Sequence, residues 1–355
     1  MDNLTHTLVG VTLVRAGLGR RAPGAMAVML VAANAPDIDI VTAFTGGAVP
    51  YLAAHRGSTH GPIGVALCGL AAAAIVWLVL QRRRDPDRRS SFATLARVGL
   101  VGAILHVLMD LPTSYGTRIL APFDNTWFAF DWLPIIDLYI WTMLVAGVIA
   151  VRVVPARTAG IARTVLVCVL SFYGVRAIAH GRALERAAAT PASGIALPCL
   201  TAPVLTRHPD ASTGLAAGMP AGARADGCLQ AAAIPTFLSP FRWTLIRRYA
   251  DGYELRDASL VSDEPCGKLW IPSAPQQGHE AAERADTARV FLAFSRMPAV
   301  AATVLPDGSR RVRFLDVRFL RGPFGFPNEP QPYAPFVVTV VLSPDGAIVQ
   351  QRLGD

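Results

Sequence analysis

Three stretches of the chain are apolar over a length that can cross a lipid bilayer. They are 61–81, 132–154 and 159–179, and the first of them carries no charged residue. A helix of about 20 apolar residues spans the hydrocarbon core of a bilayer, so each stretch is a candidate membrane helix. Three shorter or interrupted apolar segments raise the predicted number of helices to about six; they are 3–19, 24–44 and 96–111.

The overall composition agrees with a membrane protein. Of the 355 residues 52% are hydrophobic and 16% are charged, a balance more apolar and less charged than that of soluble domains. The N-terminal segment has no basic region before its apolar part and no small-residue cleavage site after it, so a cleaved signal peptide fits poorly. Lys268 is the single lysine, and the formal charge of +8 therefore reflects arginine usage and gives no reason to expect nucleic-acid binding.

The arginines gather in alternate connections between the predicted helices. These are Arg15, Arg20 and Arg21; then Arg82, Arg83, Arg84, Arg88, Arg89 and Arg97; then Arg152, Arg157 and Arg163. Because arginine-rich connections stay on the cytoplasmic side, the other ends face outward. We therefore predict a multi-pass membrane protein, with everything after about residue 180 outside the cytoplasm.

Histidine and aspartate side chains gather at the outward ends of this arrangement. They are His6, Asp37, Asp39, His55, His60, His106, Asp110, Asp131 and Asp137. For any one of them alone, a capping aspartate or a satisfied interfacial histidine is the commoner explanation. Ionisable groups in membrane segments are costly and usually functional, so their joint occurrence predicts a site at the outer boundary of the membrane.

Local spacing supports two parts of that site. His106 and Asp110 are four residues apart, which places both on one face of a helix. Pro36, in the sequence "APDID", disfavours helical geometry at the preceding residue and predicts a helix break that frees Asp37 and Asp39. The alternative for these two carboxylates is an Asx turn at the membrane boundary.

The sequence "HRGSTHG" at 55–61 supplies the remaining chemistry. His55 and His60 flank Gly57 and are expected on a turn before the third helix. Imidazoles and carboxylates without cysteine suit a catalytic Zn²⁺, Mn²⁺ or Fe²⁺ site that keeps a position open for water. Such an ion lowers the pKa of that water and polarises a phosphoryl or acyl oxygen.

We interpret Arg56, His60 and Asp39 as catalytic residues. The guanidinium of Arg56 could bind a substrate oxyanion through two parallel hydrogen bonds. The alternative for Arg56 is an interfacial arginine that contacts lipid headgroups.

Five blocks of the sequence also carry a resemblance to a known family. They are "MDNLTH", "NAPDID", "HRGSTHG", "HVLMDLPTSYGTRILAPF" and "FDWLPIIDLYIW". Over roughly residues 1–180 the chain resembles the YdjM/YfhP-like family of bacterial inner-membrane proteins, which are described as metal-dependent hydrolases. Gly61 departs from the family pattern, since many relatives have serine there. The His/Asp content is similar to that of zinc phospholipase C and nuclease P1 enzymes, a fold-level analogy.

The resemblance implies a metal centre, with Asp131 and Asp137 as supporting positions. From the ligand types we predict a divalent ion, zinc first, with manganese or iron as alternatives. The implied ligands are His6, Asp37, Asp39, His55, His60, His106 and Asp110.

Residues 181–355 have a different composition and predict a β-rich soluble domain. A linker rich in Pro, Ala and Ser covers 189–203, and two Pro-Asp-Gly turns, at 306–308 and 344–346, each predict a hairpin. The segment 241–260 suggests a third strand pair, in which Trp243 is expected to be buried. The alternative is that Arg242 and Trp243 contact the substrate or the helical bundle. Relatives resembling the YfhP branch carry such an extension with a comparable P-F-R-W element.

Cysteines and the other histidines take no part in the predicted site. In an oxidising compartment Cys199, Cys228 and Cys266 permit one disulfide, and the spacing leaves all three pairings open. Cys68 and Cys168 lie in predicted membrane helices. The remaining histidines lack ligand-like neighbours; they are His180, His208 and His279.

The fold class is thus an α-helical polytopic membrane domain of about six helices (1–180) followed by an extracytoplasmic β-rich domain. We predict a membrane-bound metal-dependent hydrolase acting on a phosphoester or lipid-derived substrate, with the bilayer as its partner and the oligomeric state left open. One alternative is an ion-coupled transporter, whose site would lie near the midplane of the membrane. The other is a metal-stabilised anchor that presents the C-terminal domain as a sensor or binding module.

Overall fold

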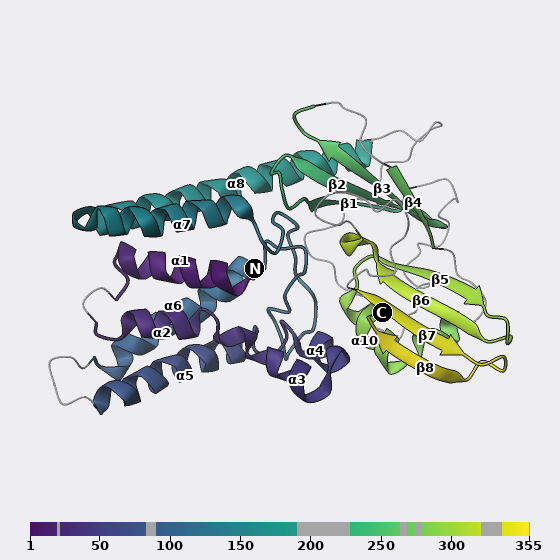
Figure 1. Cartoon of the computed structure of the whole chain (residues 1–355), viewed down its shortest axis with the longest axis horizontal. Coiled ribbons are helices and arrows are strands. Elements are labelled where there is room, and N and C mark those ends of the chain that lie inside the picture. Colours follow the sequence, from purple (N-terminus) through teal and green to yellow (C-terminus); the bar gives the residue numbers. More distant parts are fainter. Residues whose placement is uncertain are drawn as a thin grey trace. The chain divides into compact units, whose positions relative to one another are not determined.

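The computed structural model describes residues 1–19, 22–82, 90–189, 228–262, 268–273, 279–320 and 336–354. Its contacts divide the chain into two compact units, Met1–Val41 with Ala54–Ile178, and Thr42–Ala53 with Ala179–Asp355. The first unit is helical and the second contains two β-sheets (Figure 1). The predicted linker lies outside the described residues except for its first residue, at position 189. The same holds for Cys199, His208 and Cys266.

The helical unit is built from six α-helices and two short 3₁₀ segments in the described part of the chain. They are α1 (Asn3–Ala16), α2 (Ala25–Ala32), η1 (Ala35–Ile40), α5 (Pro62–Gln81), α6 (Phe92–Asp110), α7 (Leu138–Val153), η3 (Pro155–Arg157) and α8 (Thr158–Ala189), of which α8 continues into the second unit. Two further short helices, α3 (Val41–Gly46) and α4 (Ala48–Ala54), lie mainly in the second unit.

Three helices in the described residues are long and apolar enough to cross a membrane. They are Pro62–Gln81, Phe92–Asp110 and Pro155–Ala188, and the pair Ala25–Ala32 and Ala35–Gly46, bent by 46°, makes a fourth if it is one broken span. The break occurs beside Pro36, as predicted, because the α-helical pattern gives way to the 3₁₀ segment η1. Helix α7 is apolar but shorter. The count of about six crossings stays a prediction.

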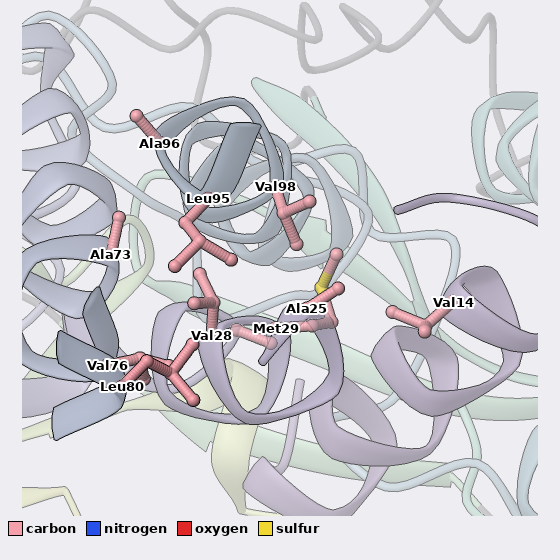
Figure 2. Close-up of a cluster of buried hydrophobic side chains, with 11 residues drawn as sticks. Val14, Ala25, Val28, Met29, Ala73, Val76, Leu80, Leu95, Ala96 and Val98 are labelled. Atoms are coloured by element: carbon pink, nitrogen blue, oxygen red, sulfur yellow. The ribbon is translucent and has the colours of Figure 1, made fainter. Parts of the chain in front are cut away.

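The core of the helical unit lies where α1, α2, α5 and α6 meet. Figure 2 shows Val28 and Met29 of α2 directed toward Leu95 and Val98 of α6, and all four side chains are buried. Helices α5 and α6 approach most closely at Gly69 and Gly99, where a Cβ on Gly99 would stand 2.2 Å from the Gly69 carbonyl oxygen. Small residues at such crossings let membrane helices pack backbone to backbone.

The second unit holds two four-stranded antiparallel sheets, each with its strands in sequence order. The first consists of β1 (Gln230–Pro235), β2 (Arg242–Arg248), β3 (Gly252–Ser259) and β4 (Lys268–Pro272). The second consists of β5 (Pro298–Val304), β6 (Arg310–Asp316), β7 (Val337–Leu342) and β8 (Ile348–Leu353). Short helices α9 (His279–Glu283) and α10 (Asp286–Phe294) precede the second sheet. The three predicted strand pairs are confirmed as β5–β6, β7–β8 and β2–β3.

Alternate residues of β1 belong to two different hydrophobic cores, one on each face of the first sheet. Ala232 and Ile234 belong to a core shared with residues of β5 and of η4 (Val317–Phe319). Ala231 and Ala233 pack instead with Trp243 and with alanines of the last turns of α8. Because successive side chains of a strand point to opposite faces, one short apolar strand serves two cores. Trp243 is fully buried, as predicted.

Candidate metal centre

The predicted site residues come from the ends of helices and from the connections between them. His6 lies in the first turns of α1, Asp37 and Asp39 in η1, and His106 and Asp110 in the last turns of α6. His55 and His60 lie in the turn that precedes α5. Seven residues from four separate segments therefore meet in one cluster, formed by the terminal turns of α1 and α6, the segment η1 after the break of α2 and the turn before α5.

Four of these residues, three of them buried, form a ligand group that we call the closed group. Its members are Asp37, His60, His106 and Asp110, each offering one ligand atom. The Nε2 atoms of His60 and His106 are 3.2 Å apart, and each lies 3.4 Å from Asp110 Oδ2. The same two nitrogens lie 3.5 and 3.4 Å from Asp37 Oδ1.

A second group shares one carboxylate with the first. Asp37, Asp39 and His55 each offer one atom within 4.8 Å of the others, and we call them the open group because it has three members. The side chains of Asp37 and His55 are 16% and 13% exposed, whereas those of His60, His106 and Asp110 are fully buried. Asp37 and His55 are therefore the more exposed ligand candidates of the two groups.

Hydrogen bonds behind the ligands orient the imidazole rings. His106 Nδ1 lies 2.7 Å from the Ala33 carbonyl oxygen, to which it can only donate. Its Nε2 is then unprotonated in the neutral ring and directs a lone pair into the closed group. Thr59 Oγ1 donates to Asp39 Oδ2 at 3.2 Å and lies 3.0 Å from His60 Nδ1, so one hydroxyl links a ligand of each group.

His6 belongs to the same cluster although it is a member of neither group. Its ring stacks on His106 with centroids 3.9 Å apart, and its Nε2 lies 3.4 Å from Asp110 Oδ1. The Met1 ammonium also contacts Asp110 Oδ1. Trp141 of α7 donates to Thr5, which together with Asp2 fixes the start of α1 and hence the position of His6.

Arg56 is buried beside this cluster with its backbone in the left-handed region, at φ 54°. Its Nη2 lies 3.0 Å from Asp110 Oδ1, and its Nη1 donates to Thr113 and to the Gly116 carbonyl oxygen. Its backbone N–H donates to Asp39 at 2.9 Å. A non-glycine residue in this conformation is strained, and such strain concentrates at functional sites. The predicted contact of Arg56 with a substrate stays a prediction.

Sequence reasoning missed a second arginine, Arg118, in the connection between α6 and α7. Its Nη2 donates to the His55 carbonyl oxygen at 3.3 Å, and its guanidinium lies over Trp127 as that of Arg56 lies over Tyr115. A Cβ at Gly57 would stand 2.6 Å from that Nη2. The absence of a side chain at Gly57 thus leaves room for the guanidinium of Arg118. Nothing in the spacing of "TSYGTR" predicts that Arg118 lies at the cluster.

Gly61 has a structural reason of its own. A Cβ at this position would lie 1.7 Å from the Ala121 carbonyl oxygen. The backbone of the α6–α7 connection therefore occupies the place where a larger side chain would be.

Two predicted supporting residues lie outside both ligand groups. Asp137 caps α7 by accepting from the backbone of Tyr139 and Ile140, and it pairs with Arg176 at 3.6 Å. Asp131 is buried with φ 57° and is a member of neither group. Of the histidines excluded from the site, His180 packs against Trp243 and His279 begins α9.

The donor set fits a divalent metal ion. A tetrahedral ion with ligands at about 2.0–2.1 Å separates its ligand atoms by about 3.3–3.4 Å, close to the 3.2–3.5 Å found in the closed group. Among the described residues, Asp110 Oδ2 and both ring nitrogens of His6 are buried without a hydrogen-bond partner. Buried polar atoms are normally paired. Asp110 Oδ2 and the one unprotonated nitrogen of a neutral His6 are acceptors without a donor, which favours a cation beside them.

Comparison with known proteins places the helical part of the chain in a family of inner membrane proteins. The family of YdjM inner membrane proteins matches residues 1–183, and the chain belongs to that family. The uncharacterized protein YfhP of Bacillus subtilis (strain 168) is 30% identical over 156 residues, which is 42% of this chain. The match spans 45% of that relative, less than half of its length. No solved structure matches the chain. The family name and the apolar helices together indicate a lipid-bilayer environment.

Proposed function

We propose that this member of the YdjM family is a membrane-bound metal-dependent hydrolase that acts on a phosphoester or lipid-derived substrate at the outer face of the cytoplasmic membrane. One observation carries the proposal: two ligand groups share Asp37, and they differ in the number of protein ligands. Structural metal sites fill every position with protein, whereas catalytic sites keep one for water. Four residues complete the closed group, and three leave a position vacant in the open group.

The ligand types favour zinc, with manganese or iron as alternatives, because imidazole and carboxylate suit all three and no thiolate is present. When bound, such ions supply Lewis acidity toward a phosphoryl or acyl oxygen and lower the pKa of water to near neutrality. The chain's own residues orient the site. Thr59 fixes Asp39 against His60, and the Ala33 carbonyl fixes the tautomer of His106.

Two cations are available for a developing oxyanion. Arg56, the residue that the sequence suggests, is engaged with Asp110 on the buried side of the cluster. Arg118 is half-buried and lies beside His55, one of the more exposed ligand candidates. A guanidinium directed at an oxyanion stabilises the transition state more than the substrate, so either arginine could serve, and substitution distinguishes them.

The position of the cluster favours a hydrolase over a transporter. Transporter sites lie near the bilayer midplane on broken helices. Asp37 and Asp39 lie at such a break, but His6, His106 and Asp110 lie in the terminal turns of α1 and α6, which argues for a site near one membrane surface. We propose about six crossings, with α1 and α7 added to the apolar helices, and a C-terminal unit outside the cytoplasm. Cys228 is disulfide-bonded, which suits an oxidising compartment. A reporter active only outside the cytoplasm should work after Asp355 and fail within 84–90; the reverse result would overturn the orientation.

The decisive experiment is a panel of phosphodiester and phospholipid substrates offered to the purified full chain, with bound metal measured in parallel. We expect turnover by the wild type and loss of both metal and turnover in His60→Ala. If Arg56 stabilises the oxyanion, Arg56→Ala keeps its metal and loses about 100-fold in turnover. If Arg56 only orients Asp110, Arg56→Ala loses metal and Arg118→Ala shows the turnover defect.

The control variant is His279→Ala, because His279 lies in the β-rich unit. It should match the wild type in metal and in turnover. A wild type loaded with metal that hydrolyses nothing on the panel would contradict the hydrolase and favour a metal-stabilised membrane anchor.

A further inference from the structure

A long apolar groove lies between α7 and α8, away from the metal centre. It has a volume of about 620 Å³. Its walls are α7 from Met143 to Ala150 and α8 from Gly160 to Cys168, and Arg157 lines it at the connection between the two helices. Figure 1 shows α7 running beside the first half of α8. Small side chains on the facing surfaces, such as Ala146 and Gly160, leave the space open.

The groove faces the surroundings of the helices and not the core of the unit. Ile149, Val167 and Leu170 lie on the same two helices and are each more than half exposed. Exposed apolar side chains on a membrane helix are in contact with lipid, so the occupant of the groove comes from the bilayer.

The length of the groove matches one leaflet. Arg157 and Cys168 are 11 residues apart, which corresponds to about 16 Å along a helix at 1.5 Å per residue. The hydrocarbon core of a bilayer is about 30 Å thick, so the groove reaches from the membrane surface to about its middle. An acyl chain of one leaflet covers that depth.

Charge selects the headgroup. Arg152, Arg157 and Arg163 all lie around the α7–α8 connection, and the sequence from 138 to 184 contains no Asp or Glu. Neither helix therefore supplies a counter-charge beside the groove. Basic residues at the end of a groove between membrane helices attract anionic lipid headgroups.

We propose that the groove between α7 and α8 binds one anionic phospholipid, with an acyl chain along Ala146 and Gly160 and the phosphate at Arg157. The site is separate from the metal centre, and its occupancy does not depend on whether the protein is a hydrolase. A bound lipid there fills the space that the small residues of the two helices leave.

The test uses the purified full chain in detergent, mixed with equal amounts of dioleoyl phosphatidylglycerol and dioleoyl phosphatidylcholine. Lipid retained per chain is measured by native mass spectrometry. We expect the wild type to retain about five-fold more of the anionic lipid, the effect of one cation at the membrane surface. Equal retention of the two lipids, or no retention, would overturn the proposal.

Filling the groove tests where the lipid binds. A Cβ at Gly160 meets no atom within 4 Å, so Gly160→Leu starts its side chain in open space and extends it into the groove. It should lower retention of both lipids about ten-fold, as expected if the chain loses contact with two or more methylenes. Gly174→Leu is the matched control, because Gly174 is also in α8, has the same open surroundings and does not line the groove. Equal retention in the two variants would place the lipid elsewhere.

Removing the charge tests the headgroup contact. Arg157→Gln should bring the preference for the anionic lipid down to about one while phosphatidylcholine is retained as before. Arg152→Gln removes the same charge from the same end of the helices but from a residue outside the groove, and it should keep the preference. A preference that survives Arg157→Gln would rule out the assigned phosphate position. Unchanged metal content and thermal unfolding in all four variants establish that they are folded.

Discussion

Each unit of the molecule buries an aspartate beside an arginine, and the two pairs differ in what else surrounds the carboxylate. Asp110 in the helical unit and Asp316 in the β-rich unit are both almost completely buried, next to Arg56 and Arg318 respectively. The burial of a charge is costly unless it is paired and hydrogen-bonded. The comparison therefore separates a carboxylate that the protein satisfies from one that it does not.

Asp316 is satisfied by protein donors alone. Arg318 donates through its backbone N–H, Nε and Nη2, at 3.0, 3.0 and 2.6 Å, and Ser295 donates at 2.8 Å. Burial alone would raise the pKa of the Asp316 carboxyl, but the charge of Arg318 and these hydrogen bonds hold it below its ordinary value. The guanidinium lies over Phe294 and Phe319, which completes a structural ion pair.

Asp110 has one oxygen without a hydrogen-bond donor and three imidazoles around it. Oδ2 lies 3.4 Å from the Nε2 atoms of both His60 and His106, and His6 lies next to Oδ1. In the neutral ring, His106 Nε2 carries a lone pair and no proton. Asp110 Oδ2 and His106 Nε2 are therefore two hydrogen-bond acceptors that face each other. This surplus of acceptors, and not burial or proximity to arginine, distinguishes a ligand from a structural carboxylate.

The largest effect is expected in the satisfied pair. Asp316→Ala leaves Arg318 buried without its partner and should destabilise the β-rich unit by about 3–5 kcal/mol. Hydrogen exchange of the β6 and β7 peptides measures the loss locally. Asp307→Ala, at the exposed turn between β5 and β6, is the control and should change little. The amount of bound metal should be the same in both variants. A lower metal content in Asp316→Ala would mean that the Asp316–Arg318 pair and the metal centre are not independent.

The unsatisfied pair should respond in the opposite way. Asp110→Asn removes a negatively charged ligand and should weaken metal binding by about 100-fold or more, the upper end of what outer-shell changes cost. Exchange in the β-rich unit should be unaltered. Asp137→Asn also changes a buried aspartate beside an arginine, Arg176, but lies outside both ligand groups and should keep its metal. Equal metal affinity in the two variants would refute the closed group.

The local parts of this architecture could be predicted from the sequence. A four-residue spacing puts His106 and Asp110 on one face, a proline ends the regular helix before Asp37, and Pro-Asp-Gly turns close two hairpins. Each rests on interactions between residues close in the chain. The sequence also predicts that the distant His- and Asp-containing stretches come together, because the arginine pattern places all the ligand candidates at the same ends of the helices.

What could not be predicted depends on packing between distant segments. Arg118 reaches His55 only because the α6–α7 connection folds over Gly57 and Gly61. Asp137 looks the same in sequence as the ligand aspartates, but its side chain is used as a helix cap. The division into a closed and an open group depends on separations of a few ångströms, which residue types do not encode.

A smaller effect is expected from the hydroxyl that links the two groups. Thr59→Ala removes the hydrogen bond to Asp39 and the contact with His60, and it should weaken metal binding about ten-fold. Thr59→Ser keeps the hydroxyl and should restore affinity, which a purely steric role would not explain. Thr126→Ala is the control, because Thr126 makes the same kind of contact with Asp124 outside the site. Metal competition with a chromophoric chelator gives the affinities.

The smallest effect concerns a buried group that responds to pH and not to metal. Tyr253 is buried in the β-rich unit and donates to the Pro298 carbonyl oxygen at 2.9 Å. Burial raises the pKa of its hydroxyl to about 12, while the unfolded value is about 10. The stability that this neutral hydroxyl provides is therefore full below pH 10 and is lost as the pH rises toward 12.

Tyr253→Phe should consequently cost about 1 kcal/mol at pH 7, the value of one hydrogen bond. Between pH 10 and 11 the wild type should lose about 1 kcal/mol more than the variant, because only the wild type has this proton to release. Urea unfolding of the full chain, followed by the circular dichroism of the strands, measures the difference. Adding a chelator should not change this difference in stability, because the Tyr253 hydroxyl is bonded to a protein carbonyl and not to a metal ion. If Tyr253→Phe loses the same stability at alkaline pH as the wild type, the pH dependence belongs to another group. If the loss of stability changes when a chelator is added, the β-rich unit also depends on the metal.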